Sequence, residues 1–588
     1  MSAQTKKTSS RIPPEVGGIQ VNFCKNPSCA NFGVPARQFS ARGPSHPDRR
    51  DTYHVSGGKT SRHVLICHLC GESVPIKSNL AIVEEIERLT SDTKPNDDPR
   101  CPTQGCVNAS VALFTGKDHY YPHGKTHSGS NRYKCRACGA TFSVPAKSTY
   151  RQLRPEINRD IFKLLVNKVP MRRICEISQI RPTTLYGKID FLHQQCVRFA
   201  HAHEQRLKEG SSIRRLYLCV DRQDYVFNWG TQLDRRNVVL RAVGSADNDT
   251  GYVFGTHLDY DSRLDAEHVE REALAIGDYD LPYGYRRFAR VWLQRDFGDL
   301  IRSTENARHR LARAALRDQI KTTYEVTEGR NDIEQDQVHG TETKLPGRGM
   351  QIHTEYTLYG HFFYLKTLFG GVEKLRFFLD QEAGIRAACF AAFHDEIHAR
   401  RVDAFFVRIN KDMTVREKKL AKAQSQVALN RALQANPGMT SSEVINLLTQ
   451  ERIRQMEPIG RWNDRWLSHP FPDMSEPEKA VCYLTDFGDY AADHLARLYA
   501  KATLHAIDRY FMQIRRRISL LERPISTASA NRTWHGYSAY NPEVAAKLLG
   551  IFRIFYNYVL VGKDRKTPAM RLGLTQGPID MNTIIAWR

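Results

Sequence analysis

The stretch RRLYLCVD at residues 214–221 predicts a buried β-strand. The five residues before its last are apolar or aromatic and alternate between the two faces of an extended chain, which is typical of a strand covered on both sides. We expect this strand to end at Asp221. A buried strand with an acid at its tip can present that acid as a metal ligand, so Asp221 is the first candidate site residue.

The stretch KLRFFLD at residues 374–380 has the same form and ends in Asp380. An amphipathic helix is expected at residues 382–396, and a further strand at 403–408. If the two acid-bearing strands are neighbours in one sheet, Asp221 and Asp380 lie together although more than 150 residues separate them. Two nearby carboxylates can hold divalent metals about 3.5–4 Å apart, one activating an attacking oxygen and one stabilising the leaving oxygen.

The segments around these two strands follow a definite order. Strand-like runs joined by tight turns come after Asp221, which predicts an antiparallel meander that begins with the acid-bearing strand. A mostly helical stretch and a polar linker follow the meander, and a predominantly helical insertion comes later. The expected ranges are strands at 225–229, 237–243 and 252–258, a turn at 246–251, helices within 266–323, a linker at 328–350 and the insertion at 411–489, which contains a capping box of Thr440 and Glu443.

A third acid is expected on a long amphipathic helix over residues 490–518 that packs across the sheet. Asp508 lies at the edge of its apolar stripe, and Arg515 follows two turns later on the same face. This pattern suits a metal ligand followed by a phosphate contact, although a solvated acid on an amphipathic helix gives the same pattern. The other candidate acids are Glu522 after the helix, Asp395 and Glu396 before a strand, and Asp224 in a turn.

The composition favours a polyanionic partner. The 588 residues carry a formal net charge of +22 and a pI near 9.4, which favours nucleic acid. The length predicts roughly three to five domains. No apolar run of about 18 residues exists, and the N-terminus is polar without a secretory signal. We therefore expect a cytoplasmic protein with no membrane partner, whose thirteen cysteines are metal ligands or core residues before disulfides.

Eight cysteines form two matched sets before residue 140. In each set a Cys-x4-Cys pair precedes a Cys-x2-Cys pair, with Asn two residues after the second cysteine and Gly after the last. Such aligned features indicate an internal repeat. Four thiolates satisfy a closed structural zinc site, so we predict zinc ribbons at 18–90 and 95–150, over the alternative of scattered core cysteines. The expected zinc ligands are Cys24, Cys29, Cys67 and Cys70 in the first ribbon, and Cys101, Cys106, Cys135 and Cys138 in the second.

Residues 151–205 have a helical texture. A helix over 155–167 precedes a short helix around 172–177, a turn near 179–182 and a longer helix from about Thr184. This spacing matches a helix-turn-helix DNA-binding domain, although any small three-helix bundle gives a similar pattern. The second helix would present four side chains to a major groove, namely Thr183, Thr184, Tyr186 and Lys188.

Taken together, these residues resemble the bacterial insertion-sequence transposases of the DDE class. The resemblance covers most of the chain and includes its C-terminal end, with an aromatic run at 551–559 and the stretch DRKTPAMRLGL at 564–574. It implies a multidomain protein in which an α/β ribonuclease-H-like core, with a mixed five-stranded sheet, follows the zinc ribbons and the helix-turn-helix. The core would occupy 211–410, be interrupted by the insertion at 411–489 and be completed at 490–588, which ends in a helical segment.

The resemblance also implies the site and the activity. Asp221 and Asp380 match the first two acids of the family, and Asp508 stands where the family commonly has Glu, with Arg515 as the basic residue seven positions on. Two Mg²⁺ or Mn²⁺ ions would support cleavage at the terminal repeats of the element and joining of the freed 3′ hydroxyl to target DNA. A dimer or higher oligomer in a synaptic complex, associated with the bacterial nucleoid, is implied.

Two other functions use the same features. One is a zinc-ribbon DNA-binding regulator whose nuclease-like core is inactive. The other is a structure-specific nuclease without strand transfer, which would use the same acids.

Overall fold

The computed structural model forms two compact units, which we describe separately. The core unit comprises Met1–Glu87, Leu207–Gln513 and Arg523–Glu543, and the second unit comprises Arg88–Arg206, Ile514–Glu522 and Val544–Arg588. The structure describes residues 10–38, 52–57, 63–93, 99–113, 116–127, 129–145, 147–150, 152–208, 213–228, 234, 236–298, 320–321, 343–382, 384–410, 413–460, 462–523, 525–526, 533–534 and 540–587. No helix among these residues is both long and apolar enough to cross a membrane.

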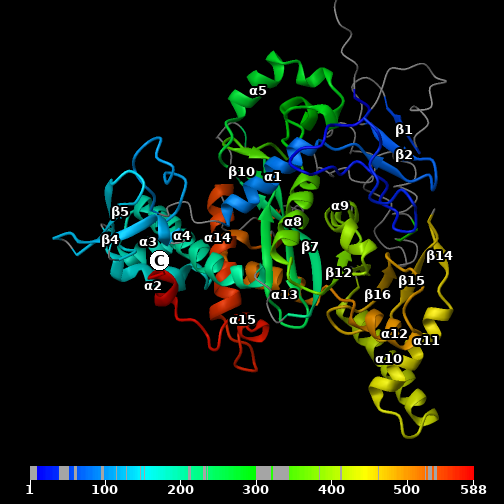
Figure 1. Cartoon of the computed structure of the whole chain (residues 1–588). Coiled ribbons are helices and arrows are strands. Elements are labelled where there is room, and N and C mark those ends of the chain that lie inside the picture. Colours follow the sequence, from blue (N-terminus) through cyan, green and yellow to red (C-terminus); the bar gives the residue numbers. More distant parts are fainter. Residues whose placement is uncertain are drawn as a thin grey trace, which may run out of the picture. The chain divides into compact units, whose positions relative to one another are not determined.

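The core unit is built on an eight-stranded mixed sheet with the strand order β14-β15-β16-β13-β12-β7-β8-β9 (Figure 1). Strands β7, β8 and β9 form the expected antiparallel meander, and β12 and β13 run parallel to β7 on its other side. The bounds are β7 Arg215–Phe227, β8 Val238–Asp247, β9 Val253–Leu258, β12 Lys374–Asp380 and β13 Val402–Ile409. The two acid-bearing strands are therefore neighbours, which is the condition under which Asp221 and Asp380 were expected to lie together.

Strand β7 does not end at Asp221, which corrects one prediction. It continues to Phe227, because β8 pairs with it without interruption from Leu218 to Phe227. The separate strand expected from residue 225 is the end of β7 itself, and residue 229 lies outside the described residues. Asp221 thus lies within a strand paired to β8, opposite Gly244, and the pairing of β7 with β12 reaches the preceding residue, Val220.

The sheet is wider than the five strands expected, because the second half of the predicted helical insertion is not helical. It adds β16, β15 and β14 to the free side of β13. The first half is helical as predicted, and both of its helices begin at capping boxes, including the one at Thr440 and Glu443. These elements are α10 Val415–Ala435, α11 Ser441–Arg454, β14 Pro458–Ile459, β15 Asp464–Ser468 and β16 Lys479–Tyr483.

Helices cover both faces of the sheet. One face carries α8 Thr354–Leu368 and α9 Ile385–His398, since the phenyl rings of Phe362 and Phe393 pack on Phe377 of β12. The neighbouring β12 residue Phe378 points to the opposite face and packs there with Phe405, which contacts α12. That face carries α12 Ala492–Lys501 and α13 His505–Arg517, shown in orange in Figure 1.

The single helix predicted over residues 490–518 is two helices, broken between Lys501 and His505. Polar side chains next to β16 hold the break. The carboxylate of Glu476 accepts a hydrogen bond from the backbone N–H of Leu504, and the Lys479 ammonium donates to the carbonyl of Ala502. These bonds satisfy backbone groups that would otherwise form the continuous helix.

The remaining elements of the core unit lie around the sheet. The three-stranded sheet of the first cysteine set and helix α1 precede it in the chain, and α5 is the one longer helix described between residues 262 and 298. Most of the predicted helical stretch beyond residue 298 and most of the linker at 328–350 lie outside the described residues. The bounds are β1 Tyr53–Ser56, β2 Val64–Cys67, β3 Ser73–Pro75, α1 Asn79–Asp92, β10 Tyr260–Asp261, α5 Ala266–Ala275, β11 Met350–Gln351, β17 Ile525–Ser526 and β18 Thr533–Trp534.

The second unit contains the second cysteine set, a group of helices and the C-terminal end of the chain. Its long helix α4 packs on the C-terminal residues: the ring of Phe199 contacts Tyr558 and Trp587, and Arg553 pairs with the buried Glu204. The bounds are β4 Tyr120–Lys125, β5 Asn131–Cys135, β6 Thr141–Val144, α2 Asn158–Leu165, α3 Met171–Ser178, α4 Pro182–Lys208, α14 Pro542–Ile554, a π-helix at Phe555–Val559, α15 Pro568–Leu572 and α16 Met581–Ile585.

We predict that Gly244 is required for the close approach of α13 to the sheet. A Cβ atom at this position would lie 2.7 Å from Cδ1 of Ile507 and 2.9 Å from Cζ of Phe511. Gly244→Ala should therefore lower the free energy of unfolding by about 1–3 kcal/mol, measured by denaturant titration. Gly370→Ala is the matched control, since a Cβ there meets nothing within 4 Å. Equal stability of the two variants would contradict this packing.

Candidate metal centres

Three carboxylates meet between the neighbouring strands β7 and β12 of the core unit, at the point where β12 ends. Asp221 of β7, Asp380 of β12 and Glu382 just beyond β12 each offer an oxygen, and these oxygens lie within 4.8 Å of one another. The parallel register pairs Val220 with Leu379, so the two aspartates occupy the next equivalent positions. Both aspartates are buried. We call these three residues the acid group.

The acid group faces the side of the sheet that carries α12 and α13. Asp221 is opposite Gly244 in the β7–β8 ladder, and Ile507 and Phe511 of α13 cover that glycine. Asp380 points to the same side as Phe378, which is two residues before it in β12. The prediction that Asp221 and Asp380 converge below a late helix is therefore supported by the strand register and the helix packing.

Glu382 was not among the acids that the sequence singled out, because residue 382 was expected to begin a helix. Helix α9 begins only at Ile385, and Glu382 lies in the short turn after β12. Its backbone N–H donates to the carbonyl of Asp380 over 2.8 Å, which turns the chain back towards the strand end. An acid two residues after a strand-end acid is the signal that could have identified it.

Arg222 supplies a positive charge beside the acid group. Its Nε donates to the Glu382 carboxylate over 2.6 Å, and its backbone N–H donates to the Asp221 carboxylate over 2.7 Å. Three carboxylates so close together repel one another strongly in a partly buried site. The hard oxygen donors of the three carboxylates suit Mg²⁺ or Mn²⁺. The acid group therefore fits a divalent cation.

Asp508 does not join the acid group. Asp508 lies half-buried on α13, and its carboxylate is close enough to Cys219 of β7 to affect the pKa of that thiol. Burial raises the pKa of the Cys219 thiol, and the neighbouring carboxylates of Asp247 and Asp508 raise it further. Helix α13 thus packs over the strands near Asp221, but the third carboxylate beside Asp221 and Asp380 is Glu382.

The other candidate acids also lie outside the acid group, and each has a basic neighbour. Glu522 pairs with Lys168 over 2.6 Å within the second unit. Asp224 pairs with Arg241 of β8 over 3.3 Å, while Asp395 and Glu396 share Lys366. Each of the four acids therefore has a basic neighbour outside the acid group.

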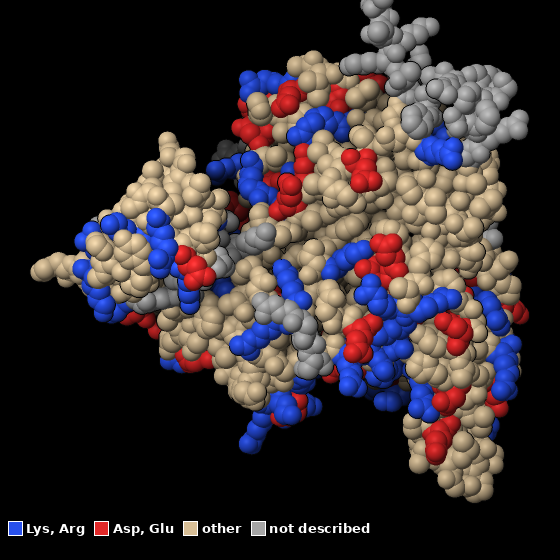
Figure 2. Space-filling model, in the orientation of Figure 1, with Lys and Arg blue, Asp and Glu red and all other residues tan. Residues whose placement is uncertain are grey.

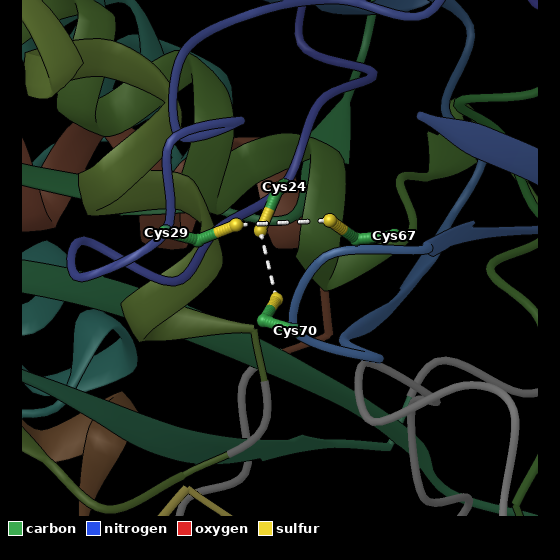
Figure 3. Close-up of side chains that lie close together, drawn as sticks. All are labelled: Cys24, Cys29, Cys67 and Cys70. Atoms are coloured by element: carbon green, nitrogen blue, oxygen red, sulfur yellow. Dashed lines mark hydrogen bonds between the residues drawn. The ribbon is translucent and has the colours of Figure 1, made fainter. Parts of the chain in front are cut away.

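The four cysteines of each predicted ribbon converge. In the first cluster Cys24 and Cys70 have their sulfur atoms 3.5 Å apart, and those of Cys29 and Cys67 are 3.7 Å apart (Figure 3). In the second cluster the Cys101–Cys138 and Cys106–Cys135 distances are 3.3 and 3.8 Å. Ligands about 2.3 Å from a tetrahedral zinc ion lie about 3.8 Å apart, so both clusters fit a metal ion of that geometry.

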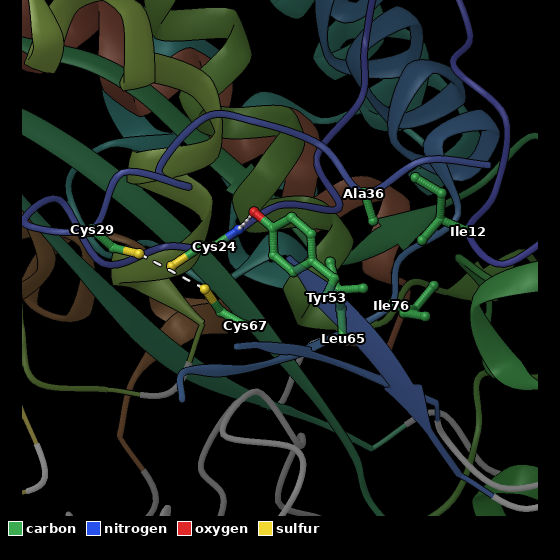
Figure 4. Close-up of a cluster of buried hydrophobic side chains, with 8 residues drawn as sticks. All are labelled: Ile12, Cys24, Cys29, Ala36, Tyr53, Leu65, Cys67 and Ile76. Carbon is green, nitrogen blue, oxygen red and sulfur yellow. Dashed lines mark hydrogen bonds between the residues drawn. The ribbon is translucent and has the colours of Figure 1, made fainter. Parts of the chain in front are cut away.

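The internal repeat extends to the hydrogen bonds around the sulfur atoms. The Asn31 amide donates to the sulfur of Cys67 over 3.2 Å, and the Asn108 amide donates to that of Cys135 over 3.3 Å. A tyrosine hydroxyl also accepts the backbone N–H of the first cysteine in each cluster, and Figure 4 shows this bond between Tyr53 and Cys24 within the buried side chains of the first cluster. These contacts explain the repeated Asn residues.

The sulfur atoms of the first cluster influence one another's protonation. The hydrogen bond between Cys24 and Cys70 raises the pKa of Cys24 and lowers that of Cys70 to about 5. Burial raises the pKa of Cys29 to about 11. A metal ion would bind all four as thiolates, so its binding must release protons.

The residues of α4 that were predicted to face a DNA groove differ in their exposure to solvent. Thr183 and Tyr186 are exposed and Thr184 is half-buried. Lys188 is buried, and its ammonium donates to the carbonyls of Leu153 and Arg154, which corrects the prediction that it contacts DNA.

The position of Lys188 follows from the helix period. The buried Leu185 lies three residues before it and the buried Leu192 four residues after it, so Lys188 lies on the apolar side of α4. Arg515, the predicted phosphate contact, is half-buried in the last turns of α13, in the part of this helix assigned to the second unit.

We predict that Lys188 stabilises the second unit. Lys188→Met keeps most of the apolar stem but removes the donors to two carbonyls, so the free energy of unfolding should fall by about 1–3 kcal/mol in a urea titration. The exposed Tyr186 provides the control, and Tyr186→Ala should change stability by no more than about 0.5 kcal/mol. A Lys188→Met protein as stable as the parent would show that these bonds contribute nothing.

We predict that the Asn108 amide strengthens metal binding by the second cluster. Asn108→Ala removes a hydrogen bond to the sulfur of Cys135 and should weaken metal binding there by about 10–100-fold. Competition with a coloured zinc chelator measures this change, while the first cluster, with its own amide from Asn31, serves as the internal control. Unchanged affinity at both clusters would contradict a role for these amides.

The chain matches no protein-family model, and a comparison with curated proteins found no match.

Proposed function

We propose that this chain is a DNA transposase whose acid group, with bound Mg²⁺ or Mn²⁺, cleaves element ends and joins the 3′ hydroxyl to target DNA. The observation that carries the proposal is the convergence of Asp221, within β7, with Asp380 and Glu382, at the end of the parallel neighbouring strand β12. Divalent ions held by such carboxylates can activate an attacking oxygen and stabilise a leaving oxygen.

The sheet supports this assignment. Strands β9, β8, β7, β12 and β13 make up a mixed five-stranded sheet of the kind expected for a ribonuclease-H-like core, to which the insertion adds three strands. In this proposal Asp221 and Asp380 bind the metal ions from fixed strand positions. Glu382 binds from the turn after β12 and exchanges its bond to Arg222 for the metal.

The charge of the chain supports a DNA substrate. The net charge is +22, and Figure 2 shows Lys and Arg side chains gathered around β12, β16 and α12 on one face of the core unit. Strand β12 carries Lys374, and α12 carries Arg497 and Lys501; all three are partly or fully exposed. Cations in such a patch bind phosphates without regard to sequence. The acid group would act on a DNA backbone held by these cations.

The second unit would supply recognition of the element ends. We assign structural zinc to both cysteine clusters, and we assign a helix-turn-helix to α3 and α4, with Thr183, Thr184 and Tyr186 facing a major groove. The cysteine clusters leave no ligand position for water, so their role is structural. A synaptic complex of two or more copies would bring two element ends together.

The position of Asp508 favours a second candidate. If strand transfer needs this third acid at the metals, a chain with Asp508 outside the acid group is a DNA-binding regulator with an inactive core. A nuclease without strand transfer would retain cleavage alone. Both alternatives keep the cysteine clusters and the basic surface.

An assay with labelled element ends, Mg²⁺ and supercoiled target DNA tests the proposal. The parent protein should give joined product, and Asp221→Asn or Asp380→Asn should lower its rate at least about 100-fold, because several kcal/mol of charge stabilisation is lost. Asp224→Asn is the control, since Asp224 is three residues from Asp221 but pairs with Arg241. Cleavage without joining would indicate a nuclease, and DNA binding without either product would indicate a regulator.

A further inference from the structure

A buried glutamate connects the first cysteine cluster to the helix that follows the acid group. Glu72 lies two residues after Cys70 and is almost fully buried. One of its carboxylate oxygens lies 3.2 Å from the sulfur of Cys24, and the other accepts a hydrogen bond from Arg386 over 3.0 Å. The carboxylate therefore touches both the cluster and helix α9.

Arg386 lies in the first turn of α9, four residues after Glu382. Its guanidinium donates to Glu72 and to the backbone carbonyl of Lys25, which follows Cys24 in the chain. It thus binds two parts of the first cluster with a rigid fork. The same guanidinium lies 5.1 Å from the ring centre of Phe390, one turn further along α9.

Aromatic packing extends this connection along α9. The ring of Phe23 packs on His394, and the ring of Phe32 packs on Phe390 and His398. Phe23 and Phe32 flank the Cys24–Cys29 pair. The cluster and α9 therefore form one packed block inside the core unit.

Electrostatics explain why an arginine is needed here. A divalent ion with four thiolates has a net charge of −2, and the Glu72 carboxylate adds another negative charge in a buried place. Arg386 supplies the cation that makes this burial tolerable. The second cluster lacks the arrangement: the residue that corresponds to Glu72 in the repeat is Ala140, and the sulfur of Cys138 lies near the hydroxyl of Thr103.

We propose that Glu72 and Arg386 position Glu382, so that the divalent-cation affinity of the acid group depends on the metal-bound first cluster and not on the second. The inference rests on the proposed metal-binding role of the acid group. With the first cluster assembled, Arg386 fixes the start of α9 and hence the short turn that holds Glu382 next to Asp380. Without the Glu72–Arg386 bond, that turn loses its anchor, and Glu382 binds the cation less well.

The test measures Mn²⁺ binding to the full chain by electron paramagnetic resonance of the free ion, with the zinc content measured in parallel. Glu72→Gln and Arg386→Gln should each raise the Mn²⁺ dissociation constant about tenfold. The double variant should be no weaker than either single variant, because both remove the same connection. Arg386→Lys, which keeps the charge but not the fork, should restore part of the affinity.

The control is Thr103→Val, which removes the hydroxyl beside the second cluster and should leave Mn²⁺ affinity unchanged. The proposal is overturned if Arg386→Gln and Glu72→Gln bind Mn²⁺ within twofold of the parent, if their effects add, or if Thr103→Val has the same effect. The variant Asp221→Asn distinguishes a failure of the proposed function from a failure of the positioning role alone. If it binds Mn²⁺ as well as the parent does, the acid group is not the cation site and the proposed function fails as well. If only Asp221→Asn loses binding, the positioning role alone is wrong.

Discussion

The parallel pairing of β7 with β12 is the constraint on which the candidate site depends. It joins two segments more than 150 residues apart in the chain and sets Val220 beside Leu379, which brings Asp221 and Asp380 to equivalent positions. Parallel neighbours require a long crossover connection, and the chain supplies it between β9 and β12. Since both strands are buried on both faces, a shift of one residue would turn the acids to the wrong side of the sheet.

Helices packed on both faces of the sheet stabilise this register. On one side, Gly244 opposite Asp221 lets α13 approach closely. On the other, α8 and α9 cover the strands, and α9 in turn carries the first cysteine cluster. That cluster is similar to the second in its ligands, its Asn amides and its tyrosine hydroxyls, yet it belongs to the core unit. The two copies of this cysteine motif therefore lie in different units and pack on different elements.

Patterns of local sequence predicted a large part of this arrangement. Alternating apolar residues identified β12 and the buried half of β7, and cysteine spacing identified all eight cysteines of the two clusters. Long-range interactions account for the errors. The extension of β7 depends on pairing with β8, the break before α13 depends on Glu476, and the burial of Lys188 depends on two distant carbonyls. Glu382 was not predicted as a site residue, because a helix was expected from residue 382 and the helix begins only at Ile385.

A crystal structure of the full chain soaked in Mn²⁺ would show whether the acid group binds the ion, because anomalous scattering locates the ion independently of activity. We expect an anomalous peak about 2.0–2.2 Å from carboxylate oxygens of Asp221 and Asp380, with Glu382 turned from Arg222 towards the ion. A peak bound elsewhere, with Glu382 still paired to Arg222 and no density between the two aspartates, would contradict it.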